Sequence, residues 1–310
     1  MKELLFMEPF FKEVIWGGSK MKEKYGYPVP GDDTGEAWVV SGNQHGKSRV
    51  KGGSFDGRSL DELWKEHGEL FGNPQEQEFP LLVKVIDAND NLSIQVHPDD
   101  DYAFRNENGS KGKTECWYIL DCEEGADIIV GHRAQNREEL EQMIRQGKWD
   151  ELLNCFPIQK GDFFYIPSGT VHAIRKGTLI LEIQQNSDVT YRLYDYGRLQ
   201  NGKPRELHLA KSMDVIVCPH RNAGSVGAWE ERDGYRKRCL AAEKYFTVEQ
   251  WKVESMLDLE QKYGFLIVDV TEGSGTADKI PVKAGDHFIV PYQYGTLHLE
   301  GKLEVITSHL

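Results

Sequence analysis

The chain has 310 residues, 39% of them hydrophobic, so it is long enough to bury a large core in one or two domains. A formal net charge of −13 at pH 7 argues against nucleic acid and anionic membrane surfaces as partners. Its five cysteines form no Cys-x-x-Cys pair and no run of about 18 uncharged apolar residues is present, which indicates a cytoplasmic protein without a membrane span.

The predicted elements, taken in chain order, are mostly β-strands. Acidic residues interrupt the apolar N-terminal stretch 1–16, so we do not expect a signal peptide. Turn signals at short intervals predict antiparallel sandwiches or barrels rather than alternating strands and helices. The clearest apolar, strand-like runs, separated by Gly, Asp and Asn clusters, are 80–90, 116–125, 161–169, 177–186 and 265–273.

A few helices interrupt these strands. Ser59 and Glu62 form a capping box, and Asn136 is a second predicted helix cap, with Gly147 as a break further on. The acidic run 99–101 is expected to be solvated surface. The three helical patterns cover residues 59–71, 136–156 and 205–217.

The stretch LSIQVHPDD (92–100) carries candidate metal ligands. Gln95 and His97 are two residues apart on a predicted strand and therefore face the same side. Further on, Gly-x5-Pro-x-Gly-x2-His, ending at His172, resembles the second signature of the cupin barrel, whose histidine points inward. Glu115 precedes another apolar strand. Taken singly, each has an ordinary alternative: a strand amide, a core histidine or a surface charge.

These four residues together predict one metal site. An amide oxygen, two imidazoles and a carboxylate suit Zn²⁺ first and Fe²⁺ or Mn²⁺ next. The predicted ligands are Gln95, His97, Glu115 and His172.

A weak internal repeat divides the chain. Residues 117–125 align with 265–273, and 161–174 align with 285–299. Only His298 survives from the metal pattern in the second copy. We therefore expect two cupin-type jelly-roll modules: a catalytic, metal-binding domain with helical insertions over 1–235, and a degenerate cupin-like β domain over 236–310.

The combined motifs resemble a known family. LSIQVHPDD, KTE (113–115), the Pro-Ser-Gly-Thr-Val-His turn and SDVTYRLYDYGR (187–198) together resemble type I mannose-6-phosphate isomerase in its short bacterial form. VIWGG (14–18) and GEAWVVSG (35–42) also resemble it. An ordinary cupin has His-x-His with a glutamate a few residues later, whereas Glu115 here lies 18 residues beyond His97.

The resemblance implies one zinc ion per subunit, held by the four residues named above. It also implies interconversion of mannose 6-phosphate and fructose 6-phosphate through a cis-enediolate. The zinc would act as a Lewis acid that stabilises the negative charge of this intermediate. The expected partner is therefore a small sugar phosphate, and the expected assembly is a monomer or a weak homo-oligomer.

The resemblance also assigns residues around the reacting carbons. Arg192 falls on the family's active-site arginine, which would stabilise the intermediate, and Lys113 on a pocket lysine. The base is left open between Glu182, a zinc-bound hydroxide and neutral Lys113. The remaining matches are substrate-binding positions: Ser93 and Arg198 for the phosphate, and Asp188 near the reacting carbons.

Two other functions use the same residues. His97, Glu115 and His172 are also a possible facial triad of an iron cupin oxygenase, but Gln95 would then occupy a position that oxygen needs. A non-enzymatic sugar-binding cupin, of the kind that some transcriptional regulators use, is the third hypothesis. No DNA-binding helix pair or basic stretch supports it.

Overall fold

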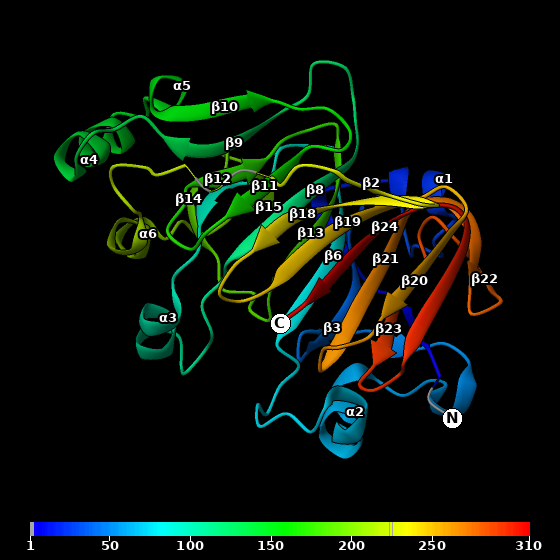
Figure 1. Ribbon diagram of the computed structural model, residues 1–310. Coiled ribbons are helices and arrows are strands. Elements are labelled where there is room, and N and C mark those ends of the chain that lie inside the picture. The colour runs from blue at the N-terminus through cyan, green and yellow to red at the C-terminus, as the bar shows by residue number, and fades with distance from the viewer. Residues whose placement is uncertain (1–2, 223, 225) are drawn as a thin grey trace.

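The fold is mainly β, as predicted, with three large antiparallel sheets and one two-stranded ribbon. The computed structural model describes residues 3–222, 224 and 226–310. The sheets pack face to face as sandwiches and do not close into barrels. Figure 1 shows the C-terminal strands, yellow to red, on the right and strands β9, β10 and β12, green, at the upper left.

The seven-stranded sheet lies in the order β11-β8-β13-β6-β3-β2, with β4 paired to β3. Its strands are β2 (Phe10–Gly18), β3 (Thr34–Asn43), β4 (Gly46–Lys47), β6 (Leu81–Ala88), β8 (Glu115–Cys122), β11 (Phe163–Ile166) and β13 (Thr178–Gln185). The five-stranded sheet lies in the order β10-β9-β12-β7-β14. Its strands are β7 (Ile94–Val96), β9 (Asp127–His132), β10 (Leu153–Pro157), β12 (His172–Ile174) and β14 (Tyr191–Tyr194).

The ten-stranded sheet lies in the order β17-β18-β19-β24-β21-β23-β1-β5, with β20 paired to β24 and β22 to β21. Its strands are β1 (Leu5–Glu8), β5 (Arg49–Val50), β17 (Glu230–Arg232), β18 (Tyr235–Ala242), β19 (Thr247–Val253), β20 (Met256–Glu260), β21 (Phe265–Ala277), β22 (Ile280–Lys283), β23 (His287–Pro291) and β24 (Thr296–His309). The ribbon consists of β15 (Leu199–Gln200) and β16 (Lys203–Pro204).

The helices are short and lie outside the sheets. None of those in the described ranges is long and apolar enough to cross a membrane. The α-helices are α1 (Lys20–Tyr25), α2 (Leu60–Glu66), α3 (Asp100–Asn106), α4 (Arg137–Arg145), α5 (Trp149–Leu152) and α6 (Leu209–Val215), and the 3₁₀ helices are η1 (Gly53–Phe55) and η2 (Gly68–Phe71).

The seven-stranded sheet buries both faces, because alternate residues of each strand point to opposite sides. On β13, Leu181 and Ile183 join a core shared with the ten-stranded sheet. Ile180 faces the other way, into a core shared with Ile128 and Ile174 of the five-stranded sheet. Glu182 has the same parity as Ile180. A charged side chain therefore points into the space between the seven- and five-stranded sheets.

The predicted repeat is visible in the sheet order. Strands β11-β8-β13-β6 of the seven-stranded sheet pair in the same order as β23-β21-β24-β19 of the ten-stranded sheet. The aligned sequence blocks fall on corresponding strands, β8 with β21 and β11 with β23. Strand β1 pairs with β23 and with β5, so residues 5–8 and 49–50 extend the C-terminal sheet. The boundary at 235/236 stays a prediction.

The helix predictions are confirmed in part. The Ser59–Glu62 capping box begins α2, Asn136 caps α4, and α6 lies within 205–217. The prediction was wrong at the end of 136–156, since residues 153–157 form strand β10 on the edge of β9. The apolar spacing there is helical, but unpaired backbone groups of β9 offer hydrogen bonds that override local propensity.

Helix α3 was not predicted, although its sequence carries a start signal. The carboxylate of Asp99 accepts a hydrogen bond from the Tyr102 backbone N–H at 2.8 Å, as an N-cap does. Asp100 and Asp101 then occupy the first turn, where negative charge is favoured by the helix dipole. The acidic run 99–101 is therefore a helix start as well as surface.

Candidate active site

The two facing sheets bring the four predicted metal ligands together. Gln95 lies on β7 and His97 directly follows that strand, while His172 begins β12 beside it, with Gln95 and His172 directly paired. Glu115 begins β8 on the opposite, seven-stranded sheet. The side chains of His97, Glu115 and His172 are almost fully buried.

The donor atoms of this cluster face one another. The Nε2 atom of His97 lies 3.4 Å from Glu115 Oε2, and that of His172 lies 3.4 Å from Glu115 Oε1. One donor atom from each of these three residues lies within 4.8 Å of the other two. The amide nitrogen of Gln95 is 3.2 Å from His172 Nε2, while its oxygen accepts a hydrogen bond from Ser93.

Hydrogen bonds on the far side of each ring fix both imidazoles. His97 donates its Nδ1–H to the carbonyl of Val189 at 2.8 Å, and His172 donates to that of Thr170 at 2.9 Å. Burial, and next the charge of Lys113, lowers the pKa of His97 to about 3, and burial lowers the pKa of His172. Both rings are therefore neutral at pH 7, with the Nε2 lone pair turned toward Glu115.

The cluster fits a divalent metal ion. His97 Nε2 is buried and has no hydrogen-bond partner among the described residues, a costly arrangement unless the lone pair binds something. Burial alone would raise the pKa of Glu115, but the positive charge of Lys113 outweighs burial and holds this pKa well below its ordinary value. Two neutral imidazoles and an anionic carboxylate are what zinc and similar ions prefer.

A cavity of about 270 Å³ lies next to this cluster, between the two sheets. Lys113 and Gln95 line it and also contact the cluster, Lys113 through Glu115 (2.9 Å) and Gln95 through His172. Asp188 also lines the cavity, and 40% of its side chain is exposed to solvent. The predicted site residues that line this space are Ser93, Gln95, Lys113, Glu182, Asp188 and Arg192.

The charged groups of the cavity have shifted proton affinities. Burial by itself would lower the pKa of Lys113, but the carboxylates of Glu115 and Glu182 outweigh it and raise the pKa. Burial, and next the charge of Glu115, raises the pKa of Glu182 above its ordinary value. Lys113 therefore stays protonated, whereas Glu182 is shifted toward neutral pH.

Sequence reasoning missed several lining residues. Lys84 on β6 is almost fully buried, and its Nζ lies 3.2 Å from Glu182 Oε1 and 3.8 Å from Glu36. A lysine inside the apolar run PLLVKVIDA was a signal that could have found it. Lys12 lies 3.6 Å above the ring of Trp38. Lys12 reaches the cavity only because strand β2 lies beside β3, and no local sequence pattern reveals this pairing.

Arg198 does not line the cavity. Its guanidinium pairs with Asp195 at 2.5 Å and donates to the carbonyl of Asn91. Arg205 lines the cavity instead and holds the same Asp195 through two hydrogen bonds of 2.7 and 2.5 Å. Arg205 and not Arg198 therefore lines this cavity, while the assignment of Arg198 to the phosphate stays a prediction.

A buried histidine–glutamate cluster that could hold a metal ion, beside a polar cavity and within paired β-sandwiches, is typical of a metal-binding cupin. Comparison with known proteins identifies the family more closely. Residues 4–125 match the family model for the type I phosphomannose isomerase catalytic domain. Residues 237–310 match the model for the mannose-6-phosphate isomerase cupin domain.

Full-length relatives agree with these matches. The Bacillus subtilis mannose-6-phosphate isomerase ManA is 48% identical over 99% of both chains. The Streptococcus mutans mannose-6-phosphate isomerase is 45% identical over 100% of this chain and 99% of its own. The crystal structure of the mannose 6-phosphate isomerase from Bacillus subtilis superposes with a TM-score of 0.97 at 46% identity, covering 100% of both chains. The chain belongs to the type I mannose-6-phosphate isomerase family.

Proposed function

We propose that this protein interconverts mannose 6-phosphate and fructose 6-phosphate with one zinc ion per chain. The observation that carries the proposal is the unpartnered His97 Nε2 facing Glu115, beside a cavity lined by cationic side chains, in a member of this family. The interconversion moves a proton between C2 and C1 of the open-chain sugar. It therefore requires a base, stabilisation of an oxyanion and a site for the phosphate.

The residues that would hold the zinc are His97, Glu115, His172 and Gln95. Gln95 would have to turn its amide oxygen away from Ser93 to become the fourth ligand. A structural neighbour with a TM-score of 0.81, at 17% identity, is a mannose 6-phosphate isomerase solved with zinc and yttrium bound. When bound, zinc supplies a Lewis acid that stabilises negative charge on a substrate oxygen.

Glu182 is the proposed proton-transfer group. Its carboxylate lines the cavity, and its raised pKa brings it toward working pH, where a general base acts efficiently. Neutral Lys113 is less suited, because the pKa of Lys113 is raised and its ammonium is bound to Glu115. Lys113 is instead a fixed positive charge beside the reacting carbons.

Arg192 is the proposed second stabiliser of the oxyanion. Its side chain lines the cavity, and its buried Nε has no hydrogen-bond partner among the described residues, so no protein acceptor competes with a ligand for this N–H. A guanidinium remains charged at all working pH values, and its electrostatic effect is stronger in a partly buried site than in water.

For the phosphate we propose Ser93 and Arg205. Arg205 is oriented by its bidentate contact with Asp195, which in turn is held by Arg198. Arg198 then acts on the phosphate site indirectly. The acidic chain meets a dianionic substrate through five cationic side chains that line one cavity: Lys12, Lys84, Lys113, Arg192 and Arg205.

The test is metal analysis together with an assay on the same purified protein. We expect about one zinc per chain, conversion of mannose 6-phosphate to fructose 6-phosphate, and loss of conversion on chelation that returns with added zinc. Iron content with oxygen uptake would support an oxygenase instead. Sugar-phosphate binding without turnover, in protein reconstituted with zinc, would support a non-enzymatic binding protein.

A further inference from the structure

The indole N–H of Trp117 lies between two carboxylates of the site. Its Nε1 is 3.1 Å from Glu115 Oε1 and 3.0 Å from Glu182 Oε2. Trp117 is fully buried. The strand register explains this position: Trp117 lies two residues after Glu115 on β8, on the same face, and directly opposite Glu182 on β13.

The ring of Trp117 also packs against a metal-site histidine. Its centroid lies 5.4 Å from that of His172, at an interplanar angle of 74°, which is an edge-to-face contact. One side chain therefore touches His172, Glu115 and Glu182. The indole N–H groups of Trp38, Trp64 and Trp251 donate to other residues, outside this group of three.

The forked hydrogen bond uses Oε1 of Glu115, which also lies 3.4 Å from His172 Nε2, and Oε2 of Glu182. Oε2 of Glu115 faces His97 and Lys113, at 3.4 and 2.9 Å. Oε1 of Glu182 faces Lys84 at 3.2 Å. An indole N–H can only donate, so the carboxylates of Glu115 and Glu182 both accept from it. The shared N–H therefore fixes the side-chain torsion of both glutamates. Without this N–H, two buried carboxylate oxygens would face each other with no donor between them.

We infer that Trp117 is a positioning residue that links the metal carboxylate Glu115 to the proton-transfer carboxylate Glu182. This inference rests on the proposed function for the role of Glu182 but not for the orientation of Glu115. Groups that hydrogen-bond a metal ligand orient it and tune metal affinity. The same N–H holds Glu182 in the orientation from which it reaches the substrate carbons.

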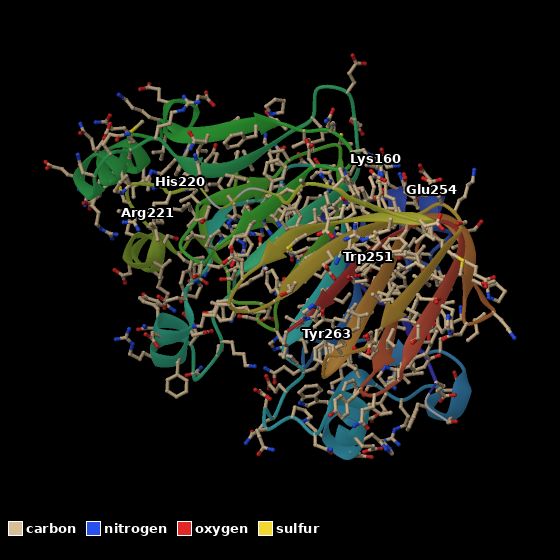
Figure 2. All side chains as sticks on the ribbon, in the orientation of Figure 1. Lys160, His220, Arg221, Trp251, Glu254 and Tyr263 are labelled. Atoms are coloured by element: carbon tan, nitrogen blue, oxygen red, sulfur yellow. The ribbon has the colours of Figure 1, made fainter. Side chains whose placement is uncertain are left out.

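The test compares Trp117→Phe with a matched control, Trp251→Phe. Trp251 is also buried and donates its indole N–H, at 3.0 Å to Thr307 Oγ1, but it lies on the C-terminal strands, where Figure 2 labels it. For Trp117→Phe we expect zinc to pass to a chromophoric chelator about tenfold faster. We also expect kcat to fall about tenfold with KM within twofold. Trp251→Phe should change none of these values.

Equal zinc release and kcat in the two variants would overturn the inference. If Trp117→Phe fails to fold, replacing Trp117 by 3-benzothienyl-alanine keeps the ring shape and removes only the N–H, with the same expectations. In a Glu182→Gln background, the effect of Trp117→Phe on kcat should shrink while its effect on zinc release remains. If the unsubstituted protein shows no isomerase activity but Trp117→Phe still releases zinc faster, Trp117 orients the metal ligand Glu115 and the proposed function is rejected.

Discussion

At the site, burial and the charges of neighbouring groups together set the pKa of single residues. Glu115 stays ionised because the ammonium of Lys113 lies beside it, and Glu182 becomes easier to protonate because it is buried and lies near that same carboxylate. Two glutamates in one buried site therefore have opposite pKa shifts. Such divergence separates a metal ligand from a proton-transfer group.

Removal of Arg192 should affect turnover and not metal binding. We expect Arg192→Ala to lower kcat about a hundredfold, the scale for loss of a transition-state donor, with zinc content unchanged. Arg175→Ala is the control, because Arg175 pairs with Asp127 and does not line the cavity. Steady-state kinetics and metal analysis of both variants test whether Arg192 contributes to turnover and not to zinc binding. An unchanged kcat for Arg192→Ala would remove this residue from the mechanism.

Substitution of the two arginines that contact Asp195, Arg198 and Arg205, should change KM by different amounts. We expect Arg205→Ala to raise the KM for mannose 6-phosphate about tenfold or more, because a charge-assisted hydrogen bond to phosphate is lost. Arg198→Ala should raise KM less, since it acts only through Asp195. Initial rates over a range of substrate concentrations measure both. If Arg198→Ala raises KM more than Arg205→Ala does, Arg198 binds the phosphate directly, as the sequence resemblance implies.

At the scale of elements, the turn after β11 holds the metal site together. The N–H of Gly169 donates to the carbonyl of His97, and its own carbonyl accepts from Val217. The carbonyl of Thr170 orients His172. One turn thus connects both metal-site histidines to the segment that follows α6.

This turn requires glycine at position 169. Its φ is +83°, and an added Cβ would lie 2.7 Å from Val217 and 2.8 Å from the carbonyl oxygen of Val215. Gly197 has a similar φ of +67° in open space. We expect Gly197→Ala to cost about 1–2 kcal/mol and Gly169→Ala clearly more, with lower zinc occupancy. Denaturant unfolding and metal analysis test this, and equal costs would contradict it.

Much of this element-scale arrangement could be predicted from the sequence. The spacing of Gln95 and His97, and the turn that leads to His172, specify which side chains share a face. Lys12 and Arg205 could not be placed, because they reach the cavity only through the order of strands in the sheet and the path of a long connection. Nor did local patterning show that residues 153–157 would add to the edge of β9.

At the scale of the whole molecule, a buried polar chain ties the N-terminal segment to the C-terminal sheet. His287 contacts Asp269 through Nδ1 and Tyr27 through Nε2, both at 2.6 Å. The hydroxyl of Tyr27 also lies 3.0 Å from the carbonyl of Gly285. Tyr27 follows α1, whereas its partners lie on or beside β21 and β23, so the contact joins distant parts of the chain.

Loss of the Tyr27 hydroxyl should weaken the fold without changing chemistry. We expect Tyr27→Phe to lower the free energy of unfolding by about 1–2 kcal/mol, because buried hydrogen bonds are lost, with kcat at 25 °C unchanged. Tyr263→Phe is the control, since the Tyr263 ring stacks on His309 and its hydroxyl has no hydrogen-bond partner among the described residues. A drop in kcat with unchanged stability would instead connect the C-terminal sheet to catalysis.

Every role proposed for the cavity residues depends on one metal ion, held by the N-terminal cluster, being required for isomerisation. The repeat offers a control, because His298 aligns with His172 but is exposed and paired with Asp258. The decisive measurement is zinc per chain and mannose 6-phosphate turnover on the same samples of His172→Ala and His298→Ala. We predict that His172→Ala loses both and His298→Ala keeps both. Full turnover by a zinc-free His172→Ala protein would contradict the account.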